Sequence, residues 1–434
     1  MTGLDGEFKF RLLDVTFFAC FDTQQMRLAN RDFGGLSMLK AVMLAISGMI
    51  FWQAGLVTPA IAAPSITVHV QSGQVTQAED AFRRWSPASL TKLMTAYVTF
   101  RALRNESLEL SSPVKISGNA ANTPPSRMGY AVGSVLTVDN ALKMLIIKSA
   151  NDIAVALGEA VAGSEPAFVQ LMNEVAVGLG MTGTSFVNPH GLHDVNQYTT
   201  ARDMALLSRA IRLEFPEFDR LFAAEAIRVG DAVTPTYNLL LGRYDGADGM
   251  KTGFVCASGF NIVASATRNN DTVITVVMGE PSQKARGEKS ARLMDDAFLK
   301  VASGADLPDL TSLPVNQSQA SQPMANLRPQ VCTEQARASR WDGRQIEGFL
   351  TFDTPSITAL QRPPVAISAG LGGAEGQSAS AVIMNGTVIS GYPIPERKPF
   401  RPTLLEEGDS ERFGLRPGFN APVPTTRPTN LNAG

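Results

Sequence analysis

The chain has 434 residues, 44% of them hydrophobic, which is enough for a sizeable core and for two or three domains. Its formal net charge is −2 and its pI is near 6.0, so no strong basic field is present to hold nucleic acid by its phosphates. We therefore expect no nucleic-acid partner and look for a local site that binds something smaller.

The cysteines and histidines do not form a pattern typical of metal binding. The three cysteines contain no CxxC pair, and His190 and His193 lie in a stretch with Pro and Gly rather than in an HExxH helix. We therefore expect a protein without a metal or another cofactor.

Residues 38–62 have the three parts of an export signal. Lys40 supplies the positive start, the run AVMLAISGMIFWQAGLV supplies the apolar centre, and small residues precede a cleavage point after Ala62. Gly and Gln residues interrupt the apolar run, which favours a cleaved signal over a permanent membrane helix. We expect export to the periplasm or cell envelope, with residues 1–37 as an N-terminal extension that translation from Met38 would omit.

Residues 63–303 are predicted to form one dense globular domain. Strands are expected at both ends of this region and helices between them, which indicates one sheet with helices on its faces. The expected strands are 66–70, a second one from Val75, 260–267 and 272–278, and the expected helices begin near Ser86 and cover 138–147, 152–162, 165–179, 201–213 and 286–303.

Residues 304–434 differ in composition, with frequent prolines and a Gln-, Ser- and Asn-rich tract. Such a segment buries little apolar surface, so we expect a Pro-rich, largely irregular C-terminal region. Asn385-Gly386 between two apolar runs is a hairpin signal and indicates a small β-module near 345–395.

The first candidate site lies at the start of a predicted helix. Ser86 is placed to cap the helix and Pro87 suits its first position, so Ser89 falls in the first turn and Lys92 shares its face. The residues around them are nearly all apolar, which indicates a buried helix and a lysine with a lowered pKa. A neutral amine there could take the proton of the serine hydroxyl. The alternative is a chance Ser-x-x-Lys whose lysine reaches solvent.

The second candidate, Ser149-Ala150-Asn151, stands between an apolar run and a helix start. Asn151 or Asp152 could simply cap that helix. In the functional interpretation, Ser149 and Asn151 point into a cleft, where they would relay a proton and bind a substrate amide.

The third candidate, Lys251-Thr252-Gly253, stands at the head of a predicted strand. Gly253 would let a ligand approach the backbone closely, while Lys251 and Thr252 could bind an anionic group. An ordinary turn into an edge strand is the alternative.

The three patterns follow one another as S-x-x-K, S-x-N and K-T-G, after an export signal. This is the motif set of penicillin-binding proteins and class A β-lactamases. Over residues 64–303 the chain resembles the low-molecular-mass penicillin-binding proteins that are serine D-alanyl-D-alanine carboxypeptidases. Blocks that extend the resemblance include PASLTKLMTAYV, NPHGL and DGMKTGFVCASGFNIVASA.

The resemblance implies an α+β fold, in which a helical cluster packs on an antiparallel five-stranded sheet with the site between them. It implies an enzyme that removes the terminal D-alanine from peptidoglycan stem pentapeptides and that β-lactam antibiotics inhibit covalently. A D,D-endopeptidase of peptidoglycan cross-links remains an alternative, because it would use the same acyl-enzyme. A class A-like β-lactamase is another, although no Glu-x-x-Leu-Asn run lies between the second and third motifs.

The resemblance also assigns roles to single residues. Ser89 is the nucleophile, Lys92 its base and Ser149 the proton relay, while Asn151 contacts the substrate. The K-T-G residues line the far wall of the site. The backbone N–H groups of Ser89 and Phe254 form the oxyanion hole.

Arg286 occupies the place of the family arginine that helps hold the substrate's terminal carboxylate, for which a guanidinium is well suited. The intact motif residues argue against a non-catalytic scaffold protein with this fold.

The chain departs from the family pattern after the predicted domain. The family usually has a β-rich second domain and a C-terminal amphipathic helix on the membrane, whereas this tail lacks a basic amphipathic run, so membrane association is not predicted from it. Cys256 and Cys332 are the cysteines left after signal removal. In an oxidising compartment they could pair and tie the early tail beside the site.

Overall fold

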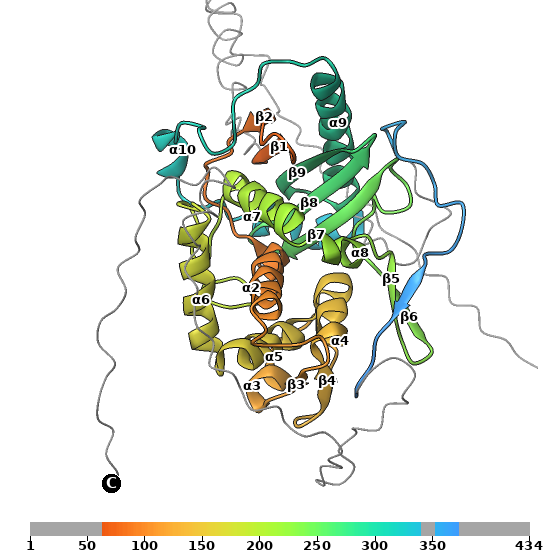
Figure 1. Cartoon of the computed structure of the whole chain (residues 1–434). Helices are drawn as coiled ribbons and strands as arrows, with labels where there is room; N and C mark the ends of the chain where they lie inside the picture. Colours follow the sequence, from red (N-terminus) through yellow and green to blue (C-terminus); the bar gives the residue numbers. More distant parts are fainter. Residues whose placement is uncertain (1–62, 340–351, 373–434) are drawn as a thin grey trace, which may run out of the picture. The chain divides into compact units, whose positions relative to one another are not determined.

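An antiparallel sheet of five strands forms the centre of the computed structural model, which describes residues 63–339 and 352–372 (Figure 1). The export signal, the N-terminal extension and the hairpin signal at 385–386 lie outside these residues. The strands, in spatial order, are β2 (Val75–Glu79), β1 (Ser65–His69), β9 (Asp271–Glu280), β8 (Gly259–Arg268) and β7 (Ala247–Val255). Among the described strands β7 pairs with β8 alone, so that it forms one edge of the sheet.

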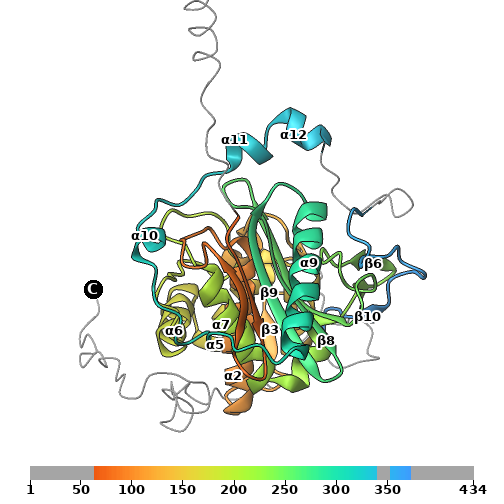
Figure 2. The ribbon, with the colours of Figure 1, turned by 90° about the horizontal axis from the view of Figure 1, so that it is seen from above.

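Helices cover both faces of this sheet. The helix α9 (Gln283–Ala302) packs on one face, and α7 (Ala201–Glu214) packs on the other (Figure 2). Strands covered on both sides read as continuous apolar runs rather than alternating ones, which is why FNIVASAT and TVITVVM predicted β8 and β9. The predicted α+β fold is confirmed.

The helical cluster lies beyond α7 and surrounds two helices that are apolar nearly all round. These are α2 (Lys92–Arg104) and α5 (Asn151–Ala162), and they pack against each other and against α6 (Glu165–Gly178) (Figure 1). Smaller elements complete the cluster: α3 (Gly118–Asn122), α4 (Val138–Lys143) and the strand pair β3 (Pro113–Lys115) and β4 (Val135–Thr137).

Two helix starts differ from the prediction. The helix expected near Ser86 begins at Lys92, because residues Ala88–Thr91 form a 3₁₀ turn, η2, in which Ala88 has a left-handed φ of 49°. Neither Asn151 nor Asp152 caps α5, since its N-cap is Ala150 without a side-chain hydrogen bond. Both differences occur where the chain meets other segments of the site.

The helix expected over 138–147 is also divided. It runs as α4 to Lys143 and continues as a π turn, η3 (Met144–Lys148), which ends at Ser149 with a φ of 61°. A π turn adds a residue to the helical repeat and is common at functional sites.

The described part of the C-terminal region packs on the domain that precedes it. Leu310 is fully buried, and the segment contains only short helices, which include α10 (Gln317–Ala320), α11 (Arg328–Val331) and α12 (Glu334–Ser339). Within 345–395, the described strand β10 (Ala366–Ser368) pairs in parallel with β5 (Ala226–Val229), which also pairs with β6 (Ala232–Pro235). None of the helices in the described residues is long and apolar enough for a membrane span.

Phe100 of α2 tests the packing of the cluster. It is fully buried, its ring stacks on Phe218 with centroids 4.0 Å apart, and it also contacts Phe215. We expect Phe100→Ala to lower the free energy of unfolding by about 3–5 kcal/mol in urea denaturation. The control Val177→Ala, on the exposed side of α6, should change it by less than about 0.5 kcal/mol. Equal effects of the two variants would contradict this packing.

Candidate active site

The hydroxyl of Ser89 and the amine of Lys92 meet at the junction of η2 and α2. Lys92 Nζ lies 3.0 Å from Ser89 Oγ and is also 2.7 Å from both Asn151 Oδ1 and the carbonyl oxygen of His190. A neutral amine has two N–H donors and one lone pair. Because the two carbonyl oxygens can accept both N–H groups, the lone pair is left for the Ser89 hydroxyl.

The surroundings of Lys92 favour this neutral form. The side chain is fully buried, and burial is the main cause that lowers its pKa well below the ordinary lysine value. The nearby charge of Lys251 lowers the pKa further, while the carboxylate of Asp152 opposes both effects. The predicted buried lysine is therefore present, and it faces Ser89 rather than solvent.

Two glycines allow distant segments to close on the Ser89 turn. A Cβ on Gly253 of β7 would lie 2.9 Å from the Ser89 nitrogen, and one on Gly191 would lie 1.8 Å from the Ala88 carbonyl oxygen. Gly191 also has a φ of 90°, which other residues rarely adopt. The K-T-G strand and the NPHGL loop can therefore approach this turn only because they carry glycine there.

The second motif is positioned by the π turn that precedes it and by the loop that contains Pro124 and Ser126. Ser149 Oγ accepts a hydrogen bond from Lys251 Nζ at 2.9 Å. The Asn151 backbone N–H donates to the Ser126 carbonyl at 2.7 Å, and Asn151 Nδ2 donates to the Pro124 carbonyl at 2.8 Å. An amide nitrogen has two N–H groups, so Asn151 has a second donor to offer a ligand.

Sequence reasoning missed the role of Asp152, which it considered only as a helix cap. Its buried carboxylate accepts hydrogen bonds from the backbone N–H groups of Met128 and Gly129 at 2.9–3.0 Å, so it holds the loop that carries Ser126. The His190 carbonyl, which accepts a hydrogen bond from Lys92, is a second group that the sequence does not predict. An acidic residue directly after the second motif is the available sequence signal for Asp152. No sequence signal marks a backbone carbonyl.

Lys251 is the second buried amine of the site. Burial, together with the charge of Arg286, lowers its pKa to about 7. Its Nζ donates to Ser149 Oγ and to the Thr252 carbonyl. A lysine with this pKa can exchange a proton near neutral pH.

Arg286 lies behind the third motif, on the first turn of α9. Its guanidinium donates to the backbone carbonyls of Gly253, Asn261 and Tyr237 at 3.2, 3.1 and 2.9 Å, and burial lowers its pKa to about 9. The residue therefore joins β7, β8 and the chain before β7, while it also lines the cleft.

The cleft between these segments has a volume of about 330 Å³. Lys92 and Lys251 lie behind its wall, in contact with Ser89 and Ser149. The predicted site residues that line it are Ser89, Ser149, Asn151, Thr252, Gly253, Phe254 and Arg286.

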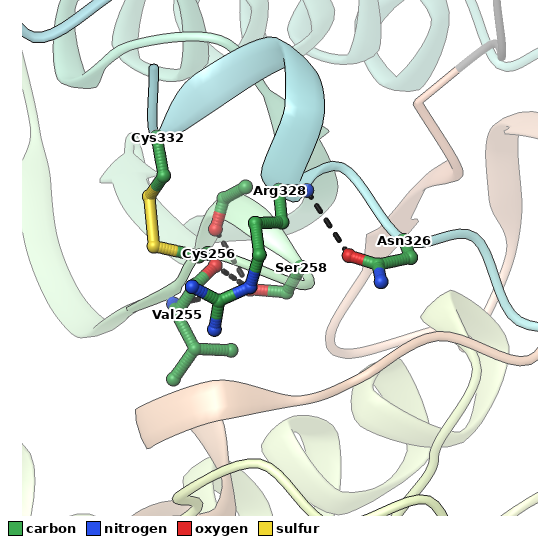
Figure 3. Close-up of a disulfide and its surroundings, with 7 residues drawn as sticks. Val255, Cys256, Ser258, Asn326, Arg328 and Cys332 are labelled. Carbon is green, nitrogen blue, oxygen red and sulfur yellow. Dashed lines mark hydrogen bonds between the residues drawn. A yellow bond between two sulfur atoms is a disulfide. The ribbon is translucent and has the colours of Figure 1, made fainter. Parts of the chain in front are cut away.

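Cys256 and Cys332 do not line the cleft; they are joined by a disulfide just past the end of β7 (Figure 3). No group of His, Cys, Asp or Glu side chains within the described residues is arranged to hold a metal ion.

The chain is similar to known proteins over the region that builds this site. A family model described as D-alanyl-D-alanine carboxypeptidase matches residues 54–282. The carboxypeptidase DacC of Escherichia coli is 37% identical over 54% of this chain and 60% of its own length, and DacA of Haemophilus influenzae is 36% identical over 57% and 64%. The chain therefore spans 60 to 64% of the length of these relatives.

Solved structures agree with these matches. Penicillin binding protein 5 from Haemophilus influenzae has a TM-score of 0.53 and 35% identity over 56% of this chain and 73% of its own. A mutant of the Streptomyces K15 DD-transpeptidase has a TM-score of 0.51 and 27% identity over 56% of this chain and the whole of its own.

The pH dependence of stability tests the buried amine of Lys251. Its pKa is about 7 in the folded protein and 10.5 in the unfolded chain, so the unfolded chain binds more protons between these values. Stability should therefore rise with pH in this window, by up to about 1.4 kcal/mol per pH unit. Lys251→Met removes this titration, so its stability relative to the wild type should be most favourable below pH 7 and decline toward pH 10.

The measurement is the free energy of unfolding in urea at several pH values. Lys115→Met, at an exposed position, is the control and should show no such trend. A difference between Lys251→Met and the wild type that does not vary with pH would contradict the assignment.

Proposed function

Because the chain belongs to the D-alanyl-D-alanine carboxypeptidase family, as its three motifs predicted, we propose that it removes the terminal D-alanine from peptidoglycan stem peptides. The reaction would proceed through an acyl-enzyme on Ser89. The observation that carries the proposal is the 3.0 Å contact between Ser89 Oγ and the buried amine of Lys92, at the wall of an open cleft.

Acylation begins with transfer of the Ser89 proton to the lone pair of Lys92. Ser89 Oγ attacks the carbonyl carbon between the two D-alanines, and the N–H groups of Ser89 and Phe254 receive the developing oxyanion. The C–N bond then breaks. Ser149, held by the hydrogen bond from Lys251, gives its hydroxyl proton to the leaving amine. Ser149 takes the proton of Lys92 in its place, so that Lys92 returns to its neutral form.

Deacylation repeats these steps with water as the nucleophile. Lys92, or Ser149 with Lys251, takes the proton of the water, whose oxygen attacks the ester carbonyl in the same oxyanion hole. The C–O bond to Ser89 breaks and the serine regains its proton. Penicillin would acylate Ser89 by the same first step.

The edge strand β7 supplies the binding surface for the peptide. An extended peptide can add to an exposed strand edge by main-chain hydrogen bonds, and the second N–H of the Asn151 amide can bind a substrate carbonyl on the other side of the cleft. The free carboxylate would lie at the Thr252 hydroxyl, in the positive potential of Arg286 and Lys251.

The same acyl-enzyme would serve a D,D-endopeptidase, and an assay of released D-alanine against cleaved cross-linked dimer separates the two activities. The β-lactamase alternative has less support, because no Glu-x-x-Leu-Asn run lies between the second and third motifs. We place the enzyme in the cell envelope, where its substrate is.

Covalent labelling by fluorescent penicillin tests the nucleophile and its base. We expect Ser89→Ala to abolish labelling and Lys92→Arg to slow it by about 10²–10⁴-fold, because a guanidinium remains protonated and cannot act as the base. Ser126→Ala, which changes another serine of the cleft, should keep labelling near the wild-type rate. Peptide mapping of the adduct should find the label on Ser89; a label elsewhere would refute the proposal.

Recognition of the free carboxylate can be measured with two peptides that end in D-alanyl-D-alanine or in its C-terminal amide. The wild type should cleave the acid with the higher kcat/KM. Arg286→Gln should reduce the ratio of the two kcat/KM values, acid over amide, by about tenfold, because the charged guanidinium no longer contributes to binding the free carboxylate. The ratio is independent of how much variant folds. An unchanged ratio would show that Arg286 acts only through the three carbonyls it binds.

A further inference from the structure

The segment that contains α11 is fixed to the turn between β7 and β8. The Leu327 backbone N–H donates to the Ala257 carbonyl at 2.9 Å, and Cys332 forms the disulfide with Cys256 (Figure 3). The buried Leu327 side chain lies against Gly259, where a Cβ would be 2.9 Å from Leu327 Cδ1. A hydrogen bond, a covalent bond and an apolar contact thus hold a segment that follows the family match by more than 40 residues.

This turn continues the wall of the cleft. Every second residue of a strand lies on the same face, so β7 carries Lys251, Gly253 and Val255 on one face. Val255, the last residue of β7, still lines the cleft. The turn is also held from beneath, because Trp85 Nε1 donates to the Ser258 carbonyl at 2.9 Å. The turn begins one or two residues after Phe254, whose N–H belongs to the proposed oxyanion hole. A strand advances about 3.3 Å per residue, so the turn lies close to that N–H group.

The segment carries a cation beside this turn. Arg328 is exposed on α11, and in the view of Figure 3 its side chain extends from α11 over the turn that carries Cys256 and Ser258. No carboxylate of the described residues forms a salt bridge with it. The attachment of α11 fixes the backbone that carries this guanidinium next to the turn, which lowers the entropic cost of binding a ligand there.

We propose that the segment around α11 forms an added wall of the cleft and that Arg328 binds a carboxylate on the substrate residue before the two D-alanines. The inference rests on the proposed function, which directs the terminal carboxylate toward Thr252 and Arg286. The acyl part of an extended peptide must then run the other way, past Val255 toward Arg328. A guanidinium at that position selects a peptide with a carboxylate side chain over its neutral counterpart.

Two matched peptides test this selectivity: N-acetyl-L-Glu-D-Ala-D-Ala and N-acetyl-L-Gln-D-Ala-D-Ala. The wild type should prefer the first by about fivefold in kcat/KM, as for one partly exposed ion pair. Arg328→Gln should abolish the preference and Arg328→Glu should reverse it. Arg337→Gln, which removes an exposed arginine of α12 in the same segment, should leave it unchanged.

The disulfide provides a second test. The double variant Cys256→Ser/Cys332→Ser should lose the preference while it still releases D-alanine from the glutamine peptide. If the wild type cleaves both peptides without preference, or if Arg328→Gln retains the preference, the inference is overturned and the proposed function stands. If neither peptide is cleaved, the proposed function fails and the inference falls with it.

Discussion

The site depends on keeping the amine of Lys92 away from water and within reach of one hydroxyl. An amine in this position loses hydration, so its neutral form is favoured, and the carbonyl oxygens of Asn151 and His190 can satisfy its two N–H groups. These two acceptors come from the second motif and from the NPHGL loop. The buried helix α2 therefore needs the rest of the helical cluster and the loop to favour the neutral form of its lysine.

The same constraint explains why three basic side chains can lie close together. Arg286 lowers the pKa of Lys251, and Lys251 lowers that of Lys92, so each positive charge disfavours a charge on the next amine toward Ser89. Such an arrangement costs stability, as do the left-handed backbone conformations of Ala88 and Ser149. Unfavourable features of this kind gather at functional sites, where the surrounding packing has to hold them in place.

Beyond the region matched by the family model, the chain continues as part of the same surface. The disulfide between Cys256 and Cys332 ties the early tail to the end of β7, and β10 adds a strand to β5. The described part of the C-terminal region is mostly irregular, as its composition predicted, but it packs on the domain rather than apart from it. Residues far from the motifs in the sequence thereby lie beside the turn that follows the third motif.

The sequence by itself determined one sheet with helices on its faces, the two longest strands of that sheet, helix α9 and the identity of the three motifs. These features depend on local periodicity and on side-chain chemistry. The resemblance that the motifs support added the α+β fold with its antiparallel five-stranded sheet. Only the tertiary structure decided that the helix carrying Lys92 begins with a 3₁₀ turn, that a π turn precedes Ser149, that Asp152 holds a loop instead of capping a helix, and that residues near 366 pair with β5. Each of these features is set by contacts between segments distant in the chain, and no local pattern encodes which segments will meet.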